Sequence, residues 1–312
     1  MWLLVCIAAV LSLTAVLAIN HKGAKMQKTS TVYFVRDISA DGIMKVYHEL
    51  GRPATGRVAI KLHMGEPGNK NFLAPELVRK LAAETNGTFV DSTVLYAGPR
   101  DNEEGSLRAA REHGFGFAPI DILDADGEMK LPIRGGKHFT DAIVGARLAN
   151  YDFIISVAHF KGHMMAGFGG TFKNLAVGMA SGKGGKRAIH SDGHNMWGST
   201  GTQFLEKIAE YNRAIMEDYG DRMVYINVLN NLSIDCDCEE HAHAPQMADI
   251  GIMASLDPVA LDRASVDAIY NSPDTGKKHL IQRIESLNGT GLLDLAEKMG
   301  LGSQKYTLVD LD

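Results

Sequence analysis

Two stretches of the sequence concentrate side chains that can do chemistry. In the first, residues 151–194, an apolar run at 153–158 leads directly into His159, Lys161 and His163. Ligands of open parallel α/β sheets bind outside the carboxyl ends of the strands, so polar groups that follow a buried strand are expected at a binding rim. Imidazole titrates near working pH. We therefore predict His159, His163 and Lys161 as the catalytic group, with either histidine as general acid or base.

The same stretch continues as a glycine-rich segment that carries further cations. Glycine allows positive φ and close backbone approach, and exposed N–H groups beside lysines can hold an anion. The pattern is neither a GxxxxGK[ST] phosphate loop nor a GxGxxG turn, which disfavours a nucleotide-binding regulator that uses Lys183 and Lys186. A glycine-rich turn packed under a neighbouring strand is the structural alternative. The predicted binding residues for a small anionic molecule are Gly169, Gly170, Lys173, Asn174 and His190.

The second stretch is SIDCDCEEHAH, in which two thiols and two imidazoles lie within a short segment. These side chains are Cys236, Cys238, His241 and His243. Sulfur and imidazole ligands at this density suit a transition metal, and zinc, iron, nickel and copper all fit. The spacing is not that of a zinc finger, and two buried cysteines beside a solvated loop are the structural alternative. We predict these four residues as metal ligands.

Composition limits the remaining classes. The chain has 312 residues, of which 45% are hydrophobic and 22% charged, which is typical of one large globular domain or two of modest size. A net charge of −5 argues against a nucleic-acid surface, because such a surface needs a clustered basic face. The third cysteine, Cys6, lies in an apolar leader, and the other two are separated by one residue, so no disulfide framework is expected.

The amino-terminal segment has two interpretations. Residues 2–19 are almost wholly apolar, which is typical of a signal peptide or a single membrane anchor, although no positively charged residue precedes them. Alternatively, translation starts at Met26, because residues 31–35 already have the pattern of a first strand. The protein is expected to be exported or membrane-anchored if residues 1–25 are real, and cytoplasmic otherwise. Membrane contact is expected only through residues 2–19.

The rest of the chain alternates between strand and helix patterns. Predicted strands cover residues 31–35, 57–62, 88–91, 120–123, 153–158, 223–229 and 248–255. Predicted helices cover residues 43–50, 74–85, 104–113, 139–149, 202–219, 259–270, 278–287 and 292–299, with Asp257 as N-cap and Pro258 as first residue of the sixth. Strands separated by helix-length segments imply βαβ crossovers. The sequence therefore predicts a mostly parallel, doubly wound, Rossmann-like α/β sheet with helices on both faces. It would occupy residues 26–312, as one domain or as two lobes at about 26–150 and 151–312.

Other predicted strands also end in polar side chains. His63 and Glu66 follow the strand at 57–62, and Asp91 and Ser92 follow residues 88–90. Because the carboxyl ends of parallel strands share one rim, these residues are expected near His163. We also expect the cysteine-containing loop to reach the same edge.

Three longer runs resemble a known family. They are AHFKGHMMAGFGGTFKNLAVGMASGKGGKRAIHSDG, NVLNNLSIDCDC and DIGIMASLDPVALDRASVD, and they resemble the DUF362 family of uncharacterised proteins, a similarity that extends from Thr31 onward. Many members are described as iron–sulfur proteins, since they carry a ferredoxin-like cysteine cluster near the position of the CDC segment. The resemblance implies a globular α/β protein linked to an iron–sulfur cluster or another metal, and it implies no known reaction.

This chain departs from those members in its cysteines. A ferredoxin-type cluster uses four cysteine thiolates, and only two cysteines lie outside the apolar leader, so the chain resembles a short member without that cluster. Three arrangements would complete a site: Cys236 and Cys238 with two histidines, a cluster shared across a homodimer, or a mononuclear metal.

Two functions follow from these residues. The first is a metal-dependent or redox enzyme that acts on a small anionic molecule. The second is a non-catalytic metal protein, electron carrier or binding protein with a structural metal site. Protein ligands at every coordination position would favour the second, and an open position facing the glycine-rich rim would favour the first.

Overall fold

The computed structural model describes residues 29–312. The predicted signal or anchor segment, residues 2–19, lies outside the described residues, as does Met26. From residue 29 onward, no helix has both the length and the apolar character that a membrane crossing requires.

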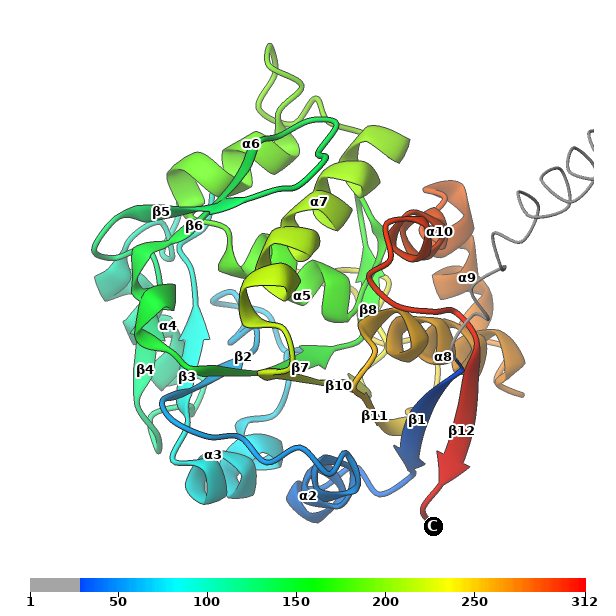
Figure 1. Ribbon diagram of the computed structural model, residues 1–312. Coiled ribbons are helices and arrows are strands. Elements are labelled where there is room, and N and C mark those ends of the chain that lie inside the picture. Colours follow the sequence, from blue (N-terminus) through cyan, green and yellow to red (C-terminus); the bar gives the residue numbers. More distant parts are fainter. Residues whose placement is uncertain (1–28) are drawn as a thin grey trace, which may run out of the picture.

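A mixed, mainly parallel sheet forms the centre of the fold (Figure 1). Its strands are β1 (Ser30–Val35), β2 (Val58–Lys61), β3 (Thr88–Asp91), β4 (Ile120–Ile122), β7 (Phe153–His159), β10 (Met223–Leu229), β11 (Gly251–Ser255) and β12 (Tyr306–Asp310). Their order is β12-β1-β11-β10-β7-β2-β3-β4, and only the pairs that involve β11 are antiparallel. The central strands β7 and β10 are buried along their whole length, as expected for strands covered on both faces.

Helices cover both faces of this sheet (Figure 1). On one face lie α2 (Ala40–Glu49) and α3 (Arg79–Thr85), and on the other lie α5 (Thr171–Met179) and α8 (Pro258–Asn271), with α7 (Gly201–Tyr219) packed on α5. The other helical segments are η1 (Pro75–Val78), α4 (Glu103–Glu112), η2 (Ala146–Asn150), η3 (Gly182–Lys186), α6 (Arg187–His190), α9 (Lys277–Ser286) and α10 (Gly291–Lys298). The predicted doubly wound α/β fold is confirmed.

Local sequence signals explain several element boundaries. The Asp257 side chain accepts hydrogen bonds from the backbone N–H groups of Val259 and Ala260, so it caps α8 as predicted, and Pro258 is the first helical residue. Strand β12 was not predicted; it pairs in parallel with β1 at the edge of the sheet.

The predicted helix at residues 139–149 is wrong. Residues Asp141–Gly145 form β6, which pairs antiparallel with β5 (Glu128–Pro132), and η2 follows. The β-branched residues Ile143 and Val144 favour an extended chain. In the hairpin, Leu131, Ala142 and Val144 enter the core, so burial decides in favour of strand.

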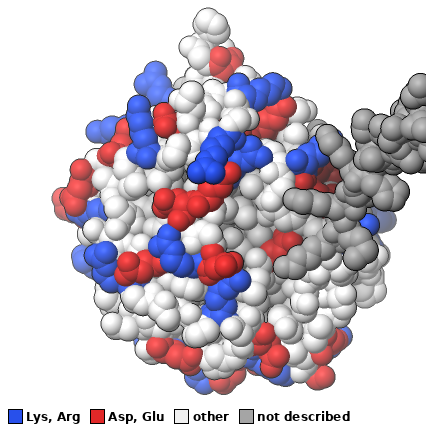
Figure 2. Space-filling view, viewed as in Figure 1, with Lys and Arg blue, Asp and Glu red and all other residues white. Residues whose placement is uncertain are grey.

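Charged side chains of both signs alternate over the face of the molecule seen in Figure 2. No large area of a single sign is visible on that face. The expectation that the protein does not bind nucleic acid stays a prediction.

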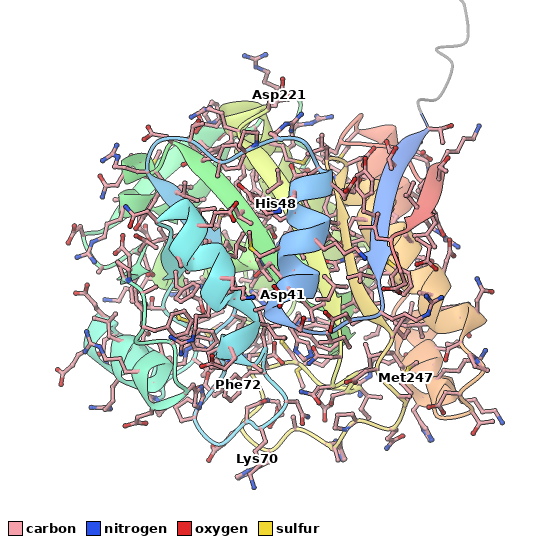
Figure 3. All side chains as sticks on the ribbon, turned by 90° about the horizontal axis from the view of Figure 1, so that it is seen from below. Asp41, His48, Lys70, Phe72, Asp221 and Met247 are labelled. Atoms are coloured by element: carbon pink, nitrogen blue, oxygen red, sulfur yellow. The ribbon has the colours of Figure 1, made fainter. Side chains whose placement is uncertain are left out.

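Two loops meet at the carboxyl ends of the central strands. The segment at 62–74 follows β2, and the cysteine-containing segment at 230–250 follows β10. The side-chain amides of Asn69 and Asn71 donate to the backbone carbonyls of Glu239 and His243, at 2.7 and 2.8 Å. In Figure 3, Lys70 and Phe72 lie at the carboxyl ends of the strands, whereas Asp221 lies at the opposite ends.

Candidate functional site

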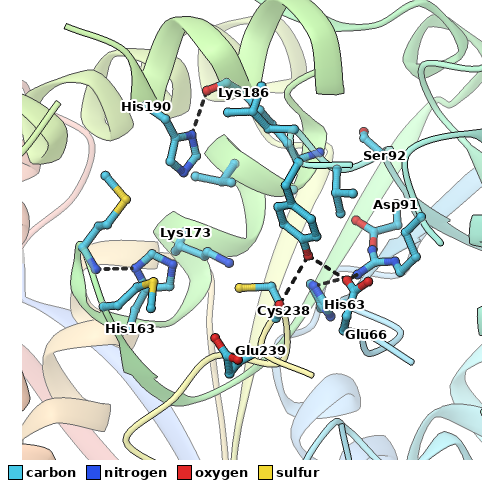
Figure 4. Close-up of a pocket in the computed structure, with 18 of the residues that line it drawn as sticks. His63, Glu66, Asp91, Ser92, His163, Lys173, Lys186, His190, Cys238 and Glu239 are labelled. Atoms are coloured by element: carbon cyan, nitrogen blue, oxygen red, sulfur yellow. Dashed lines mark hydrogen bonds and ion pairs between the residues drawn. The ribbon is translucent and has the colours of Figure 1, made fainter. Parts of the chain in front are cut away.

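A cavity of about 480 Å³ opens at the carboxyl ends of the central strands. It is lined by residues that follow β2, β3 and β7, by α5 and η3, and by the cysteine-containing loop. In Figure 4, His163 and His190 lie on one side, Asp91 and Ser92 on the other, and Lys173 and Cys238 between them. The strand ends therefore converge as the sequence predicted.

Two thiols and one imidazole, here called the thiol–imidazole group, come together at the cavity, where His163 and Cys238 line the wall and Cys236 lies behind them. Ligand atoms of His163, Cys236 and Cys238 all lie within 4.8 Å of one another. His163 comes from the short hairpin of β8 (Lys161–His163) and β9 (Gly167–Gly169), and the cysteines come from the loop after β10. The expected convergence of these two distant segments is confirmed.

Hydrogen bonds fix the orientation of the His163 ring. Its Nδ1 accepts from the backbone N–H groups of Met165 and Ala166, at 3.2 and 3.0 Å. Nε2 is therefore the nitrogen left for the thiols, and in the neutral ring it carries the proton. Burial lowers the pKa of His163, and the positive charge of Lys173 lowers it further, although Cys236 opposes the shift.

The environment of Cys236 favours its thiolate. The Lys173 ammonium donates to the Cys236 sulfur at 3.3 Å. A hydrogen bond from the Cys238 thiol, together with Lys173 and His163, holds the pKa of Cys236 well below its usual value despite burial. The same hydrogen bond and burial raise the pKa of Cys238, so the two sulfurs share one proton. Burial would lower the pKa of Lys173, but the two cysteines raise it above its usual value.

Asp237, which lies between the two cysteines in sequence, connects the cysteine-containing loop to His159 and Lys161. Its buried carboxylate lies 2.8 Å from Nδ1 of His159 and 2.7 Å from the Lys161 ammonium. Nε2 of His159 faces the backbone carbonyl of Asn230 at 2.7 Å. Burial alone would raise the pKa of Asp237, but the charges of His159 and Lys161 hold it below its usual range. Both nitrogens of His159 are thus engaged, and its ring is not part of the cavity wall.

A second buried ionic network forms the opposite wall. Lys61 and Arg100 both contact the Asp91 carboxylate, at 3.1 and 2.8 Å, and Arg100 also contacts Glu66 at 3.2 Å. Burial opposes ionisation of Asp91, but the two cations outweigh it and lower its pKa. Burial and the Arg100 charge lower the pKa of His63 well below its usual value, so this ring is neutral.

The glycine-rich turns bind carboxylates of the chain itself. At the start of α5, the backbone N–H groups of Thr171 and Phe172 donate to Asp262, and a Cβ at Gly170 would lie 2.4 Å from that carboxylate. In η3, the N–H groups of Gly182 and Gly184 donate to Asp124 and Glu128. These backbone donors therefore have internal partners.

Two of the predicted anion-binding residues have defined partners. The Asn174 side chain accepts from Lys61 and donates to Ser156 and to the Lys61 carbonyl, so it joins α5 to β2 and β7. The His190 Nδ1 donates to the Lys186 carbonyl at 2.7 Å, which leaves Nε2 as an acceptor. Burial lowers the pKa of His190 to about 3, so the ring is neutral. Both residues line the cavity, as do Gly170 and Lys173, whereas Gly169 lies next to the Lys161 side chain and is not part of the lining.

The other two predicted metal ligands lie outside the thiol–imidazole group. The His241 side chain is 84% exposed, and His243 binds Asp235 through Nδ1 at 2.6 Å on the outer side of the loop. The structure thus places His163 beside the thiols, and not the imidazoles that are closest in sequence.

Several residues of the site carried weak sequence signals. Lys61 ends the otherwise apolar strand VAIK, and a lysine in a buried strand indicates an internal partner. Arg100 lies in a segment that reads as an ordinary loop, so only the tertiary structure brings it to Asp91. Lys186 belongs to the glycine-rich segment, but the sequence linked it only to the disfavoured nucleotide-binding role, and the structure places it on the cavity wall.

Residues 58–267 match the family described as a domain of unknown function, DUF362, and the match covers more than half of the chain. The chain belongs to the DUF362 family. The glycine-rich segment after β7 and the CDC segment after β10 both fall within the residues matched. No curated protein matches the sequence.

The solved structures that align with this DUF362 chain include the following two. The lactate racemase apoprotein from Thermoanaerobacterium thermosaccharolyticum has a TM-score of 0.45 and 14% identity, with 76% of this chain and 56% of that chain covered. A structural genomics target from Thermotoga maritima has a TM-score of 0.45 and 12% identity, with 83% and 58% covered. The present chain spans little more than half the length of either.

Proposed function

We propose that this DUF362 protein is a metal-dependent enzyme that acts on a small organic anion. Cys236, Cys238 and His163 would hold one thiophilic transition metal. The observation that carries the proposal is that three ligand atoms of suitable chemistry lie within 4.8 Å of one another where His163 and Cys238 line a cation-bearing cavity. Three protein ligands would leave a coordination position open to substrate or water, as in catalytic metal sites.

The donor set fits a single ion. Thiolate is the ligating form of cysteine, and Cys236 is favoured in that form by Lys173 and His163. Two sulfurs with one nitrogen suit zinc, iron, nickel or copper. Among residues 29–312 the only cysteines are these two, so one chain does not supply the four thiolates of a ferredoxin-type cluster.

The residues of this chain would position the substrate. When bound, the metal would supply Lewis acidity or a redox centre. Lys173, which donates to the Cys236 sulfur and lines the same cavity, would add to the positive potential that draws an anionic substrate into the cavity. The neutral His190 offers Nε2 as an acceptor for a substrate hydroxyl, because its Nδ1 is bound to the Lys186 carbonyl. The cavity, at about 480 Å³, has the size of a small-molecule site.

The hydrogen bonds of His163 favour a second candidate, a metal-free thiolate site. A histidine that binds metal through one nitrogen normally donates an N–H from the other. Nδ1 of His163 instead accepts from Met165 and Ala166, so a metal at Nε2 has to displace the ring proton. With the proton retained, His163 and Lys173 stabilise the Cys236 thiolate as a nucleophile, with Cys238 as a neighbouring thiol.

Metal analysis after anaerobic purification tests the proposal. We expect about one transition-metal ion per chain, and its loss in Cys236→Ser and in His163→Ala. His241→Ala and His243→Ala are the matched controls, since both imidazoles lie on the outer side of the same loop, and they should retain the metal.

Two results would contradict the assignment. If the metal is lost in His243→Ala but kept in His163→Ala, its ligands come from the cysteine-containing loop alone and do not include His163. A metal-free wild-type protein whose Cys236 reacts rapidly with iodoacetamide would favour the thiolate site.

A further inference from the structure

One buried hydroxyl on the cavity wall has no partner. Ser92 directly follows β3, is 1% exposed, and its Oγ makes no hydrogen bond within residues 29–312. Leaving a buried polar group unpaired costs about 1–3 kcal/mol. Ser92 lines the cavity, so its hydroxyl, which lacks an internal partner, is suited to bind a ligand there.

A second donor contacts the residue that follows Ser92. The Lys186 ammonium donates to the carbonyl of Thr93, the next residue after Ser92, at 2.7 Å, and to the Ala180 carbonyl at 3.0 Å. An ammonium has three N–H donors, so one remains. Lys61 differs, because its ammonium already donates to Leu62, Asp91 and Asn174. Of these two lysines, Lys186 is therefore the one whose ammonium has an N–H group left for a ligand.

Apolar side chains form the remainder of the wall. Val94, Leu95, Val177 and Trp197 line the same cavity, and Trp197 is 44% exposed while its ring meets His190 edge-on at 5.2 Å. An inorganic ion would contact only the polar wall. The apolar surface fits the organic part of a ligand.

We propose that Ser92 Oγ and Lys186 Nζ form an oxyanion subsite that binds the carboxylate or phosphate of an organic substrate, whose apolar part lies against Leu95 and Trp197. The assignment rests on the proposed function and names the substrate class of the same cavity. The thiol–imidazole group then faces the body of the substrate, across the cavity from its charged group (Figure 4).

Calorimetric titration of the full-length protein as purified tests the subsite. The probes are benzoate, phenyl phosphate and acetate. Benzoate or phenyl phosphate should bind more tightly than acetate, and the tighter of the two identifies the charged group. Ser92→Ala should weaken binding of that probe by about 10- to 100-fold, which is the effect of one hydrogen bond to a charged group.

Ser199→Ala is the matched control. The Ser199 hydroxyl is also buried and without a partner within residues 29–312, but it does not line the cavity. Both variants remove an unpartnered hydroxyl, so both should fold. Equal affinity in the two variants would overturn the subsite. Trp197→Ala should weaken the aromatic probe and leave acetate unchanged, and equal loss for both would remove the apolar contact from the proposal.

The pH profile of wild-type binding gives an independent readout. Burial lowers the pKa of Lys186 to about 8, with Asp91 and Asp124 opposing the shift and Lys61 and Arg100 adding to it. Lys186 is charged below this value and neutral above it, so benzoate affinity should fall as the pH rises through about 8. A flat profile up to pH 9.5 would count against Lys186.

The two proposals fail separately. Anion binding that depends on Ser92 in a metal-free protein would discard the metal and keep the subsite. Bound metal together with anion binding that does not depend on Ser92 would keep the metal and discard the subsite.

Discussion

At the scale of single residues, the site depends on buried charges that neutralise one another. The Asp237 carboxylate pairs with the Lys161 ammonium and also contacts His159, and all three side chains are buried. An unpaired buried charge is far more costly than the same charge in water, because the interior solvates it poorly. The geometry of the cysteine pair therefore depends on the residue between them.

Replacement of Asp237 should show this dependence. Asp237→Asn keeps the shape but removes the carboxylate that pairs with the buried Lys161 ammonium, so we expect the free energy of unfolding to fall by about 3–5 kcal/mol. Urea denaturation followed by circular dichroism measures it. Asp221→Asn, at an exposed ion pair with Arg52, should change it by less than about 0.5 kcal/mol. If the free energy of unfolding falls by a similarly small amount in both variants, neighbouring groups replace the interaction that Asp237 makes.

At the scale of elements, the hairpin β8–β9 and the cysteine-containing loop form one unit. The Gly162 N–H donates to the Ser233 carbonyl at 2.8 Å, and a Cβ at Gly162 would lie 2.2 Å from the Ile234 carbonyl oxygen. Only glycine permits this approach, which brings His163 to the thiols.

Gly162→Ala should therefore separate the ligands while the sheet stays folded. Because the loop has to move away from β8, we expect metal affinity to fall by about 10- to 100-fold, as for other changes next to metal ligands. Competition with a chromogenic chelator measures the affinity. Gly116→Ala is the control, since its added Cβ meets nothing closer than Arg111 Cγ at 3.7 Å. Equal affinity in both variants would mean that the loop adapts without cost.

The elements also show which features a sequence discloses. Alternating strands and helices, apolar runs such as β7, and the Asp257–Pro258 start of α8 are local signals, and the structure agrees with them. The helix predicted at 139–149 failed because pairing with β5 decides the conformation of β6, and the sequence pattern does not display its partner.

The site was partly predictable for the same reason. Strand ends that share a rim are implied by parallel topology, so His163 and the cysteine loop were expected together. Which imidazole meets the thiols depends on how the loop turns. In the structure, Asp235 binds His243 away from the thiols. Gly162 allows β8 to approach the cysteine-containing loop closely, which places His163 beside the thiols.

At the scale of the whole molecule, the thiol–imidazole group links parts of the chain that are distant in sequence. His163 follows β7 in the middle of the sheet, and the cysteines lie in a loop that also contacts the segment after β2 through Asn69 and Asn71. A ligand that binds only the folded state stabilises it by RT ln(1 + [L]/Kd), or about 2.7 kcal/mol at one hundred times Kd. Metal held at this junction should therefore stabilise the entire fold.

Removal of the metal tests this coupling. A chelator should lower the Tm of the wild-type protein by about 5 °C, the shift that corresponds to a few kcal/mol for a chain of this size. The Cys236→Ser/Cys238→Ser double variant has no site to empty, so the chelator should leave its Tm unchanged. His243→Ala should respond as the wild type does, because its imidazole lies outside the thiol–imidazole group. Differential scanning calorimetry provides the three comparisons, and an equal shift in the double variant would place the stabilising metal elsewhere in the chain.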